Sequence, residues 1–272
     1  MKYALIAGNG RFPILALEEA RKLGHDVVAI GIREEASGEI AGLASKTHWI
    51  SLGELSRLIE ILKDEGIREL FMAGQVKHVR IFSSIRPDWR LARLLLSLRE
   101  KNTDALIGGV AKVLADEGIE LRDSTFLLKP LLAAAGSMTK RRPSSEEEKD
   151  IRYGRRVANA LAGFDIGQSV AIAGRACLAV EAMEGTDEML RRAASLANGR
   201  PICLVKVSRR REHLLFDVPV AGVETIAVMR DTGATALAVD AGRTLLLDRE
   251  EMLRKANEAG IALCGYAPGE VE

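Results

Sequence analysis

The chain has few cysteines and few aromatic residues, and neither sign of charge dominates. Its 272 residues include three cysteines, Cys177, Cys203 and Cys264, without CxxC or metal-type spacing. Because the cysteines are few and their number is odd, we expect no disulfide framework and a location in a reducing compartment. Aromatic residues make up 4% of the chain, and 39 basic residues face 38 acidic ones. These values argue against a base-stacking platform and a strongly basic surface, so we expect no nucleic-acid partner.

Long hydrophobic runs are also absent from the sequence. A transmembrane helix needs about 20 consecutive apolar residues. The opening MKYALIAGNG has too short an apolar run for a signal peptide. Hydrophobic residues at 47% and charged residues at 28% are typical of a soluble globular protein. The sequence therefore predicts a cytoplasmic location, and contact with a membrane surface stays open.

The first half alternates apolar runs with helical patterns. Strands are predicted at 2–7, 25–32 and 67–74, with helices at 13–23 and 56–66 between them. This alternation favours a parallel sheet with right-handed crossovers. We therefore predict an α/β fold whose first domain covers residues 1–133.

The composition changes after that domain. Residues 134–150 are rich in glycine, proline, serine and charge, which predicts a linker. Residues 151–272 mix helices with two predicted hairpins, around Gly174-Arg175 and around Gly242, and a helix capped by Thr186. We expect a second, mixed α/β domain there.

Glycines mark two candidate ligand sites in the first domain. Gly8 and Gly10 join a strand to a helix, where close backbone approach and a helix N-terminus suit a phosphate. Ala73 and Gly74 end another predicted strand, and ligands of open α/β sheets lie beyond the carboxyl ends of strands. Plain turns explain both patterns about equally well.

Acidic and basic side chains are denser in the second half. Glu181 and Asp187 flank a strand-to-helix junction, and carboxylates are preferred ligands of Mg²⁺. Alternatively, Asp187 only complements the helix dipole. Lys206 lies in an apolar strand, and Asp217 stands between two bulky apolar residues. A helix cap or a structural ion pair is the plain alternative for Asp217.

Several segments together resemble a known family, the UDP-2,3-diacylglucosamine pyrophosphatases of the LpxI type. The similarity runs in order over nearly the whole chain. Its motifs are GNGRFP at the start, AGQV at 73–76, DIGQSV at 165–170, AVEAMEGTDEML at 179–190, LVK at 204–206, FDVPVAGVET at 216–225 and the later LLLDRE.

The resemblance implies a specific activity and architecture. Such enzymes hydrolyse the pyrophosphate of UDP-2,3-diacylglucosamine to UMP and 2,3-diacylglucosamine 1-phosphate (lipid X), a step of lipid A biosynthesis. They have an N-terminal Rossmann-like domain and a distinct C-terminal domain, with substrate held between them. They need a divalent cation, commonly Mg²⁺. The amphipathic substrate implies transient contact with the inner membrane surface.

Residue roles follow from the motifs. The resemblance implies that Asp217 is the essential aspartate, which binds the metal or accepts the proton of the attacking water. Glu181 and Asp187 are candidates to complete the metal site, and Lys206 to stabilise charge on the phosphate oxygens. The expected substrate-binding residues are Gly8, Gly10, Ala73, Gly74, Gln168, Ser169, Asp187, Lys206, Gly222 and Thr225.

Two rival interpretations remain open. One is a nucleotide- or nucleotide-sugar-binding protein without hydrolase activity, and the other is a regulatory protein that kept the fold. The sequence also leaves the oligomeric state open, with a homodimer among the alternatives.

Overall fold

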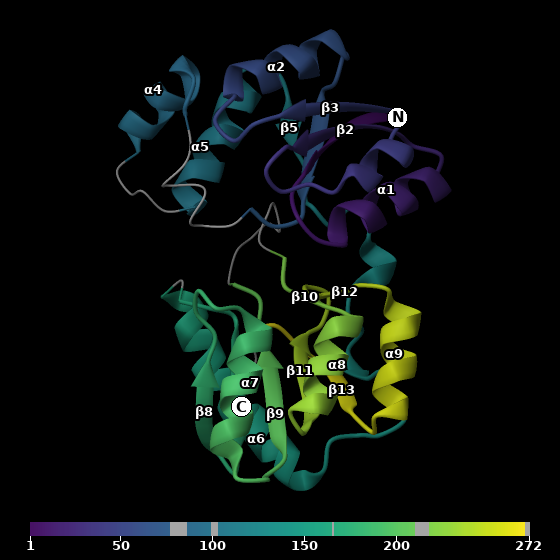
Figure 1. Cartoon of the computed structure of the whole chain (residues 1–272), viewed down its shortest axis with the longest axis vertical. Helices are drawn as coiled ribbons and strands as arrows, with labels where there is room; N and C mark the ends of the chain where they lie inside the picture. Colours follow the sequence, from purple (N-terminus) through teal and green to yellow (C-terminus); the bar gives the residue numbers. More distant parts are fainter. Residues whose placement is uncertain (77–85, 99–102, 165, 210–217, 270–272) are drawn as a thin grey trace. The chain divides into compact units, whose positions relative to one another are not determined.

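The computed structural model describes residues 1–76, 86–98, 103–164, 166–209 and 218–269 (Figure 1). The chain forms two compact units, Met1–Leu127 and Leu128–Glu272. Both are α/β, which confirms the predicted fold class. Among the described residues, no helix combines the length and the hydropathy of a membrane span.

The first unit is built on one parallel sheet in the order β3-β2-β1-β4-β5, the arrangement of a Rossmann-like sheet. Its strands are β1 (Lys2–Ala7), β2 (Asp26–Ile32), β3 (Lys46–Ile50), β4 (Glu69–Ala73) and β5 (Glu120–Leu121). Its helices are α1 (Phe12–Lys22), the short 3-10 helix η1 (Gly38–Gly42), α2 (Leu55–Asp64), α4 (Trp89–Ser97) and α5 (Thr103–Asp116).

The pleat of this sheet divides its apolar side chains between two faces. Ala4, Val28 and Leu70 are in register and pack in one cluster with leucines and isoleucines of α2, α4 and α5. The alternate residues, such as Leu5, point to the other face, where α1 contacts β2 and β4. Burial of both faces explains why the strands read as continuous apolar runs.

The second unit has a mixed sheet in the order β6-β13-β11-β9-β7-β8, in which β9, β11 and β13 are parallel. Its strands are β6 (Gly136–Ser137), β7 (Ser169–Ala173), β8 (Ala176–Val180), β9 (Ile202–Lys206), β11 (Ala234–Asp240) and β13 (Ala262–Tyr266), and β10 (Val220–Ala221) pairs with β12 (Leu245–Leu246) beside it. Its helices are the short η2 (Lys129–Leu131), α6 (Ser145–Gly163), α7 (Thr186–Ala197), α8 (Val223–Asp231) and α9 (Arg249–Glu258).

Helices cover both faces of this sheet as well. Ile151 and Ala158 of α6 pack in one apolar cluster with Val205, and Gly154 allows close approach because a Cβ there would lie 2.7 Å from Val205. On the other face, α7, α8 and α9 contribute residues such as Met189 to a second cluster. The result is a three-layer arrangement, visible in the lower half of Figure 1.

One of the two predicted hairpins is present and the other is wrong. β7 and β8 pair antiparallel around Gly174-Arg175, as predicted. β11, however, is flanked on both sides by β9 and β13, so it has no free edge for a hairpin partner. The chain turns after Asp240, and β12 instead runs parallel to β10, with Val220 opposite Leu245.

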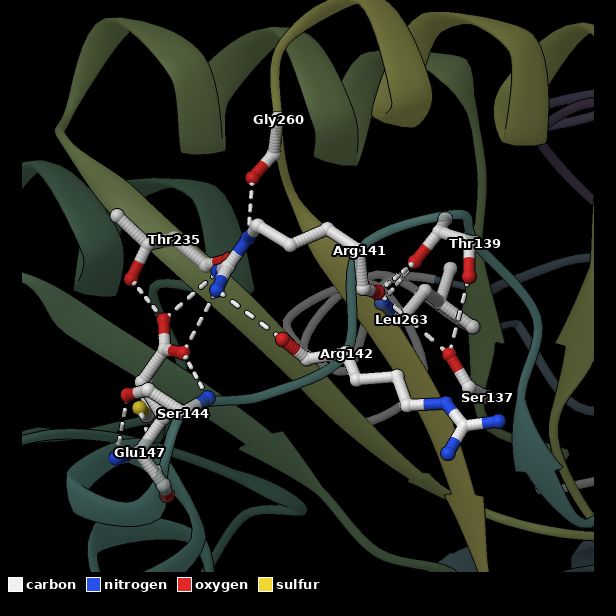
Figure 2. A network of polar contacts seen from close by, with 10 residues as sticks. Ser137, Thr139, Arg141, Arg142, Ser144, Glu147, Thr235, Gly260 and Leu263 are labelled. Atoms are coloured by element: carbon white, nitrogen blue, oxygen red, sulfur yellow. Dashed lines mark hydrogen bonds and ion pairs between the residues drawn. The ribbon is translucent and has the colours of Figure 1, made fainter.

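Residues 134–150, where the sequence predicts a linker, belong to the second unit and contain β6 and the start of α6. Figure 2 shows the polar network that fixes them. Arg141 donates to both carboxylate oxygens of Glu147 at 2.8 and 2.7 Å and to the Gly260 carbonyl at 2.6 Å. Glu147 also forms a capping box with Ser144 at the start of α6. The polar and charged side chains of residues 134–150 therefore form these contacts within the second unit, and the segment is not a flexible linker.

Glu147 is the centre of this network. Its carboxylate also accepts a hydrogen bond from Thr235 at 2.6 Å. Burial favours the neutral acid, but the hydrogen bonds from Arg141, Thr235 and the Ser144 backbone outweigh it and lower the pKa of Glu147 to about 2. An ionised, nearly buried carboxylate therefore ties α6, β11 and the 137–144 segment together.

Candidate functional site

Predicted site residues of the second unit gather at one edge of its sheet. Lys206 is the last residue of β9 and lies opposite Ser169, the first residue of the antiparallel β7. Glu181 directly follows the end of β8, and its N–H donates to the Ser169 carbonyl at 2.9 Å. The same edge holds the carboxyl end of β11, where ligands of α/β sheets commonly bind.

Thr186 links these side chains into one polar cluster. The Lys206 Nζ donates to the Thr186 Oγ1 at 2.9 Å, and this hydroxyl donates to the Glu181 Oε1 at 2.7 Å. The Ser169 Oγ lies 3.4 Å from the same Thr186 oxygen. Lys206 is only 9% exposed, so its ammonium relies on these partners. A buried cation thus reaches a carboxylate through one hydroxyl.

This arrangement corrects the predicted role of Thr186. α7 begins at Thr186 itself, its N-cap is Gly185 with φ 84°, and no side chain caps it. The Thr186 hydroxyl turns to Lys206 and Glu181 instead. Sequence reasoning placed Glu181 and Lys206 in the site but missed the residue that connects them. In a sequence, a threonine at the start of a helix is interpreted as an N-cap. Only the tertiary contacts show that the Thr186 hydroxyl links Lys206 to Glu181.

Electrostatics keep Glu181 charged. Burial favours its neutral form, but the positive charge of Lys206 and hydrogen bonds from Ser169, Thr186 and the Gln168 backbone outweigh it, so the pKa of Glu181 lies below its usual range. Glu181 is therefore ionised at neutral pH and balances the charge of Lys206.

Asp187 behaves in the opposite way. Burial raises the pKa of Asp187, and the like charges of Glu224 and Glu181 add to this effect, against the attraction of Arg191 and Lys206. Asp187 and Glu224 stand in the first turns of α7 and α8, which pack together. Predicted Gly222 and Thr225 belong to the same region, where the Gly222 N–H donates to the Thr225 Oγ1 at 3.2 Å and so caps α8.

The described residues do not assemble the predicted metal centre. No group of three or more His, Cys, Asp or Glu among them could hold a metal ion. Glu181 interacts with Thr186 and Lys206, and a cation such as Mg²⁺ would compete with Lys206 for it. Predicted Asp217 lies outside the described residues. Of the predicted metal ligands, only Glu181 and Asp187 lie within the described residues, and the divalent cation stays a prediction.

Glycine and a buried ion pair shape the surroundings of the cluster. Gly167 allows the chain before Gln168 to pass Glu181, because a Cβ there would lie 2.0 Å from the Glu181 carbonyl. Asp240, 1% exposed at the end of β11, accepts from Arg155 at 2.9 Å and from the Ser208 N–H at 2.7 Å. Sequence reasoning missed this pair, although an acid ending an apolar strand was the available signal.

The predicted glycine sites of the first unit lie together. Asn9 and Gln75 exchange backbone hydrogen bonds of 2.8 and 3.0 Å, which joins the GNG and AGQ segments. A Cβ on Gly8 would lie 2.6 Å from the Gln75 carbonyl oxygen, and one on Gly74 would lie 2.6 Å from that of Asn9. This backbone contact accounts for Gly8 and Gly74, while Gly10, at φ 97°, has open space beside it. Ala73 is buried and accepts the Gly8 N–H at 2.9 Å.

Solved structures resemble the chain only weakly. The biotin carboxylase domain of the Hydrogenobacter thermophilus 2-oxoglutarate carboxylase aligns with 72% of this chain and 41% of its own, at 13% identity and a TM-score of 0.28. The ADP complex of an N5-carboxyaminoimidazole ribonucleotide synthetase aligns with 72% of this chain and 34% of its own, at 12% identity and a TM-score of 0.29. The chain thus spans less than half of either protein.

Sequence comparisons are decisive. The family model described as the LpxI N-terminal domain matches residues 2–131, and that described as the LpxI C-terminal domain matches residues 134–264. The curated protein named UDP-2,3-diacylglucosamine pyrophosphatase LpxI, from Caulobacter vibrioides, is 30% identical over 99% of both chains. With the motifs in order along both units, this chain belongs to the LpxI family.

Proposed function

We propose that this chain hydrolyses the pyrophosphate bond of UDP-2,3-diacylglucosamine and releases UMP and 2,3-diacylglucosamine 1-phosphate, a step of lipid A biosynthesis. The family and the name of the Caulobacter relative support this activity. The structural observation that carries it is the buried ammonium of Lys206, held by Thr186 at the N-terminus of α7.

A pyrophosphate suits this edge of the sheet electrostatically. The first turn of α7 lacks a capping side chain, so its N–H groups and the positive end of the helix dipole favour an anion there. Lys206 adds a full positive charge beside that turn. Groups that are already in place where charge develops on phosphate oxygens supply much of the catalysis of phosphoryl transfer.

Each member of the cluster has a separate task in this proposal. Lys206 neutralises charge on the phosphate oxygens. Glu181 stays ionised and holds the Lys206 side chain in place, with the Thr186 hydroxyl between them. Asp187, in the first turn of α7, contacts the substrate or the cation in this proposal. Gly10 leaves open space beside the first unit's glycine segments for the nucleotide.

Asp217 and a divalent cation complete the proposal on the basis of the family resemblance. Asp217 either binds the cation, commonly Mg²⁺, or accepts the proton of the attacking water. A bound cation would supply charge neutralisation at the pyrophosphate.

Release of UMP from UDP-2,3-diacylglucosamine is the direct test. The purified chain is incubated with substrate dispersed in detergent, with Mg²⁺ and with EDTA in its place. We expect UMP with Mg²⁺, little with EDTA, and a loss of at least about 100-fold in kcat for Asp217→Ala. The matched control Glu184→Gln removes an exposed carboxylate that pairs with Arg192 at 2.6 Å, and it should keep full activity.

Each negative result of this assay would change a different part of the proposal. Binding of UMP without any turnover would favour the rival nucleotide- or nucleotide-sugar-binding protein over the hydrolase. Full activity in EDTA would remove the cation from the proposal. Full activity of Asp217→Ala would remove that residue.

The substrate in the relative's name carries two acyl chains, so we also propose that the chain works at the surface of a membrane. Its location would then be cytoplasmic and peripheral to the inner membrane.

A further inference from the structure

α4 carries two different stripes of side chains. Leu91, Leu94, Leu95 and Leu98 follow helical spacing and pack in the core of the first unit. Trp89, Arg93 and Leu96, at spacings of four and three, form a second stripe that is exposed to solvent. Arg86, just before the helix, is exposed as well. We call Arg86, Trp89, Arg93 and Leu96 the α4 patch.

The apolar members of the α4 patch are exposed to solvent. Leu96 is 88% exposed and Trp89 is 64% exposed, in the same range as Phe164 at 78% and Met183 at 75%. An isolated exposed leucine needs no explanation, but tryptophan and leucine on one helix face beside arginines form an amphipathic surface. Tryptophan with arginine is the combination that favours the boundary between lipid headgroups and acyl chains.

The charge of this region is positive. Residues 86–98 contain three arginines and a single acidic residue, Asp88. The Asp88 carboxylate caps α4 by accepting from the Leu91 N–H at 2.9 Å, and it accepts from the Ser56 N–H at 2.5 Å. Nearby Glu117 binds Arg90 of the same helix and Lys63. Arg86 and Arg93 are exposed, and neither forms an ion pair with a carboxylate of the described residues.

We propose that the α4 patch docks this chain on an anionic lipid bilayer, with Trp89 and Leu96 inserted at the headgroup boundary and Arg86 and Arg93 against lipid phosphates. The proposal rests on the membrane contact proposed above and assigns a surface to it. α4 is held against α2 and α5 by its leucine stripe, so the patch is presented on a fixed element. Binding costs little ordering as a result.

The test is flotation of the full chain with vesicles of phosphatidylcholine that contain or lack phosphatidylglycerol. We expect binding to the anionic vesicles and weaker binding at high salt. Each of Arg86→Gln and Arg93→Gln should weaken binding roughly fivefold. Leu96→Ser combined with Trp89→Ala should weaken it by about tenfold or more. All four residues are exposed, so the fold should survive.

Matched substitutions on the same unit separate the patch from general effects. Leu23→Ser removes an exposed leucine outside the patch, and Arg57→Gln removes an exposed arginine of α2 that pairs with Glu60 at 3.1 Å. Both variants should bind as the starting chain does. Lipids brominated near the headgroup should quench the emission of Trp89 on binding. Trp89→Phe should bind while losing most of that quenching, since the remaining Trp49 lies in β3.

Four results would overturn the proposal. They are no binding to anionic vesicles, equal binding to neutral ones, full binding by the patch variants, and capture of nucleic acid in place of vesicles. Hydrolysis of substrate dispersed in detergent should be unchanged in the patch variants. The vesicles hold no substrate, so failure here leaves the hydrolase proposal standing, and failure of hydrolysis leaves the vesicle result standing.

Discussion

Replacing Thr186 with valine removes the hydroxyl between Lys206 and Glu181 while keeping a branched side chain of similar volume. Two hydrogen bonds disappear, of 2.9 and 2.7 Å. A hydrogen bond to a charged group contributes about 1.5–3 kcal/mol. Lys206 and Glu181 can approach each other and recover part of this loss. We therefore expect a net loss of about 2 kcal/mol, which is roughly 30-fold in kcat/KM.

The assay is UMP release by Thr186→Val and Thr186→Ser across a range of pH. Serine restores the hydroxyl, so it should recover most of the activity. Thr186 is one of the groups that lower the pKa of Glu181, so the acid limb of the pH profile should move to higher pH in the valine variant. Thr232→Val is the control, because it removes a hydroxyl that bonds only backbone carbonyls of its own helix, those of Val228 at 2.6 Å and Met229 at 3.2 Å.

Activity of Thr186→Val equal to that of the starting chain would refute the role of this cluster. So would equal losses in the valine and serine variants, because the hydroxyl would then not be the active feature. An unmoved acid limb would show that Thr186 acts only on packing.

Two further predictions concern stability. Glu147→Gln should lower the free energy of unfolding by about 3 kcal/mol at pH 7, because the pKa of this acid falls from 4.5 to about 2 on folding. This contribution is complete above pH 4.5 and is lost as pH falls towards 2, so urea titrations of both chains should converge there, while exposed Glu146→Gln should change little. Gly74→Ala should lower the melting temperature more than Gly66→Ala does, because both have positive φ but only Gly74 faces a backbone oxygen at 2.6 Å. Equal shifts would contradict the packing account.

Sequence patterns predicted the elements of the chain where hydrophobic periodicity and turn residues agree. The helix predicted at 56–66 corresponds to α2 (Leu55–Asp64), and the strand predicted at 2–7 matches β1. The rule that ligands bind at the carboxyl ends of strands selected Ala73 and Gly74, whereas Lys206 became a candidate through its place in an apolar strand and through the family resemblance. These features depend on local sequence, and nearby residues decide them.

Features that depend on residues far apart in the chain could not be predicted from local sequence patterns. The second hairpin failed because the neighbours of β11 come from strands about 30 residues away in either direction. The role of Thr186 depends on β9 and on the end of β8, and the Arg155–Asp240 pair spans 85 residues. The spacing of residues in the sequence does not predict such contacts, because these residues come together only in the tertiary structure.

Lys206 and Glu181 together test whether the cluster serves stability or chemistry. Lys206→Met alone leaves the half-buried carboxylate of Glu181 without its cation, so it should destabilise the second unit. Adding Glu181→Gln removes that charge, so the double variant should regain much of the lost melting temperature. A buried ion pair contributes little net stability compared with neutral residues of similar size.

If the pair exists to hold phosphate, UMP release should stay lost in the double variant although the fold recovers. Recovery of activity together with stability would mean that the pair is structural and that the phosphate binds elsewhere.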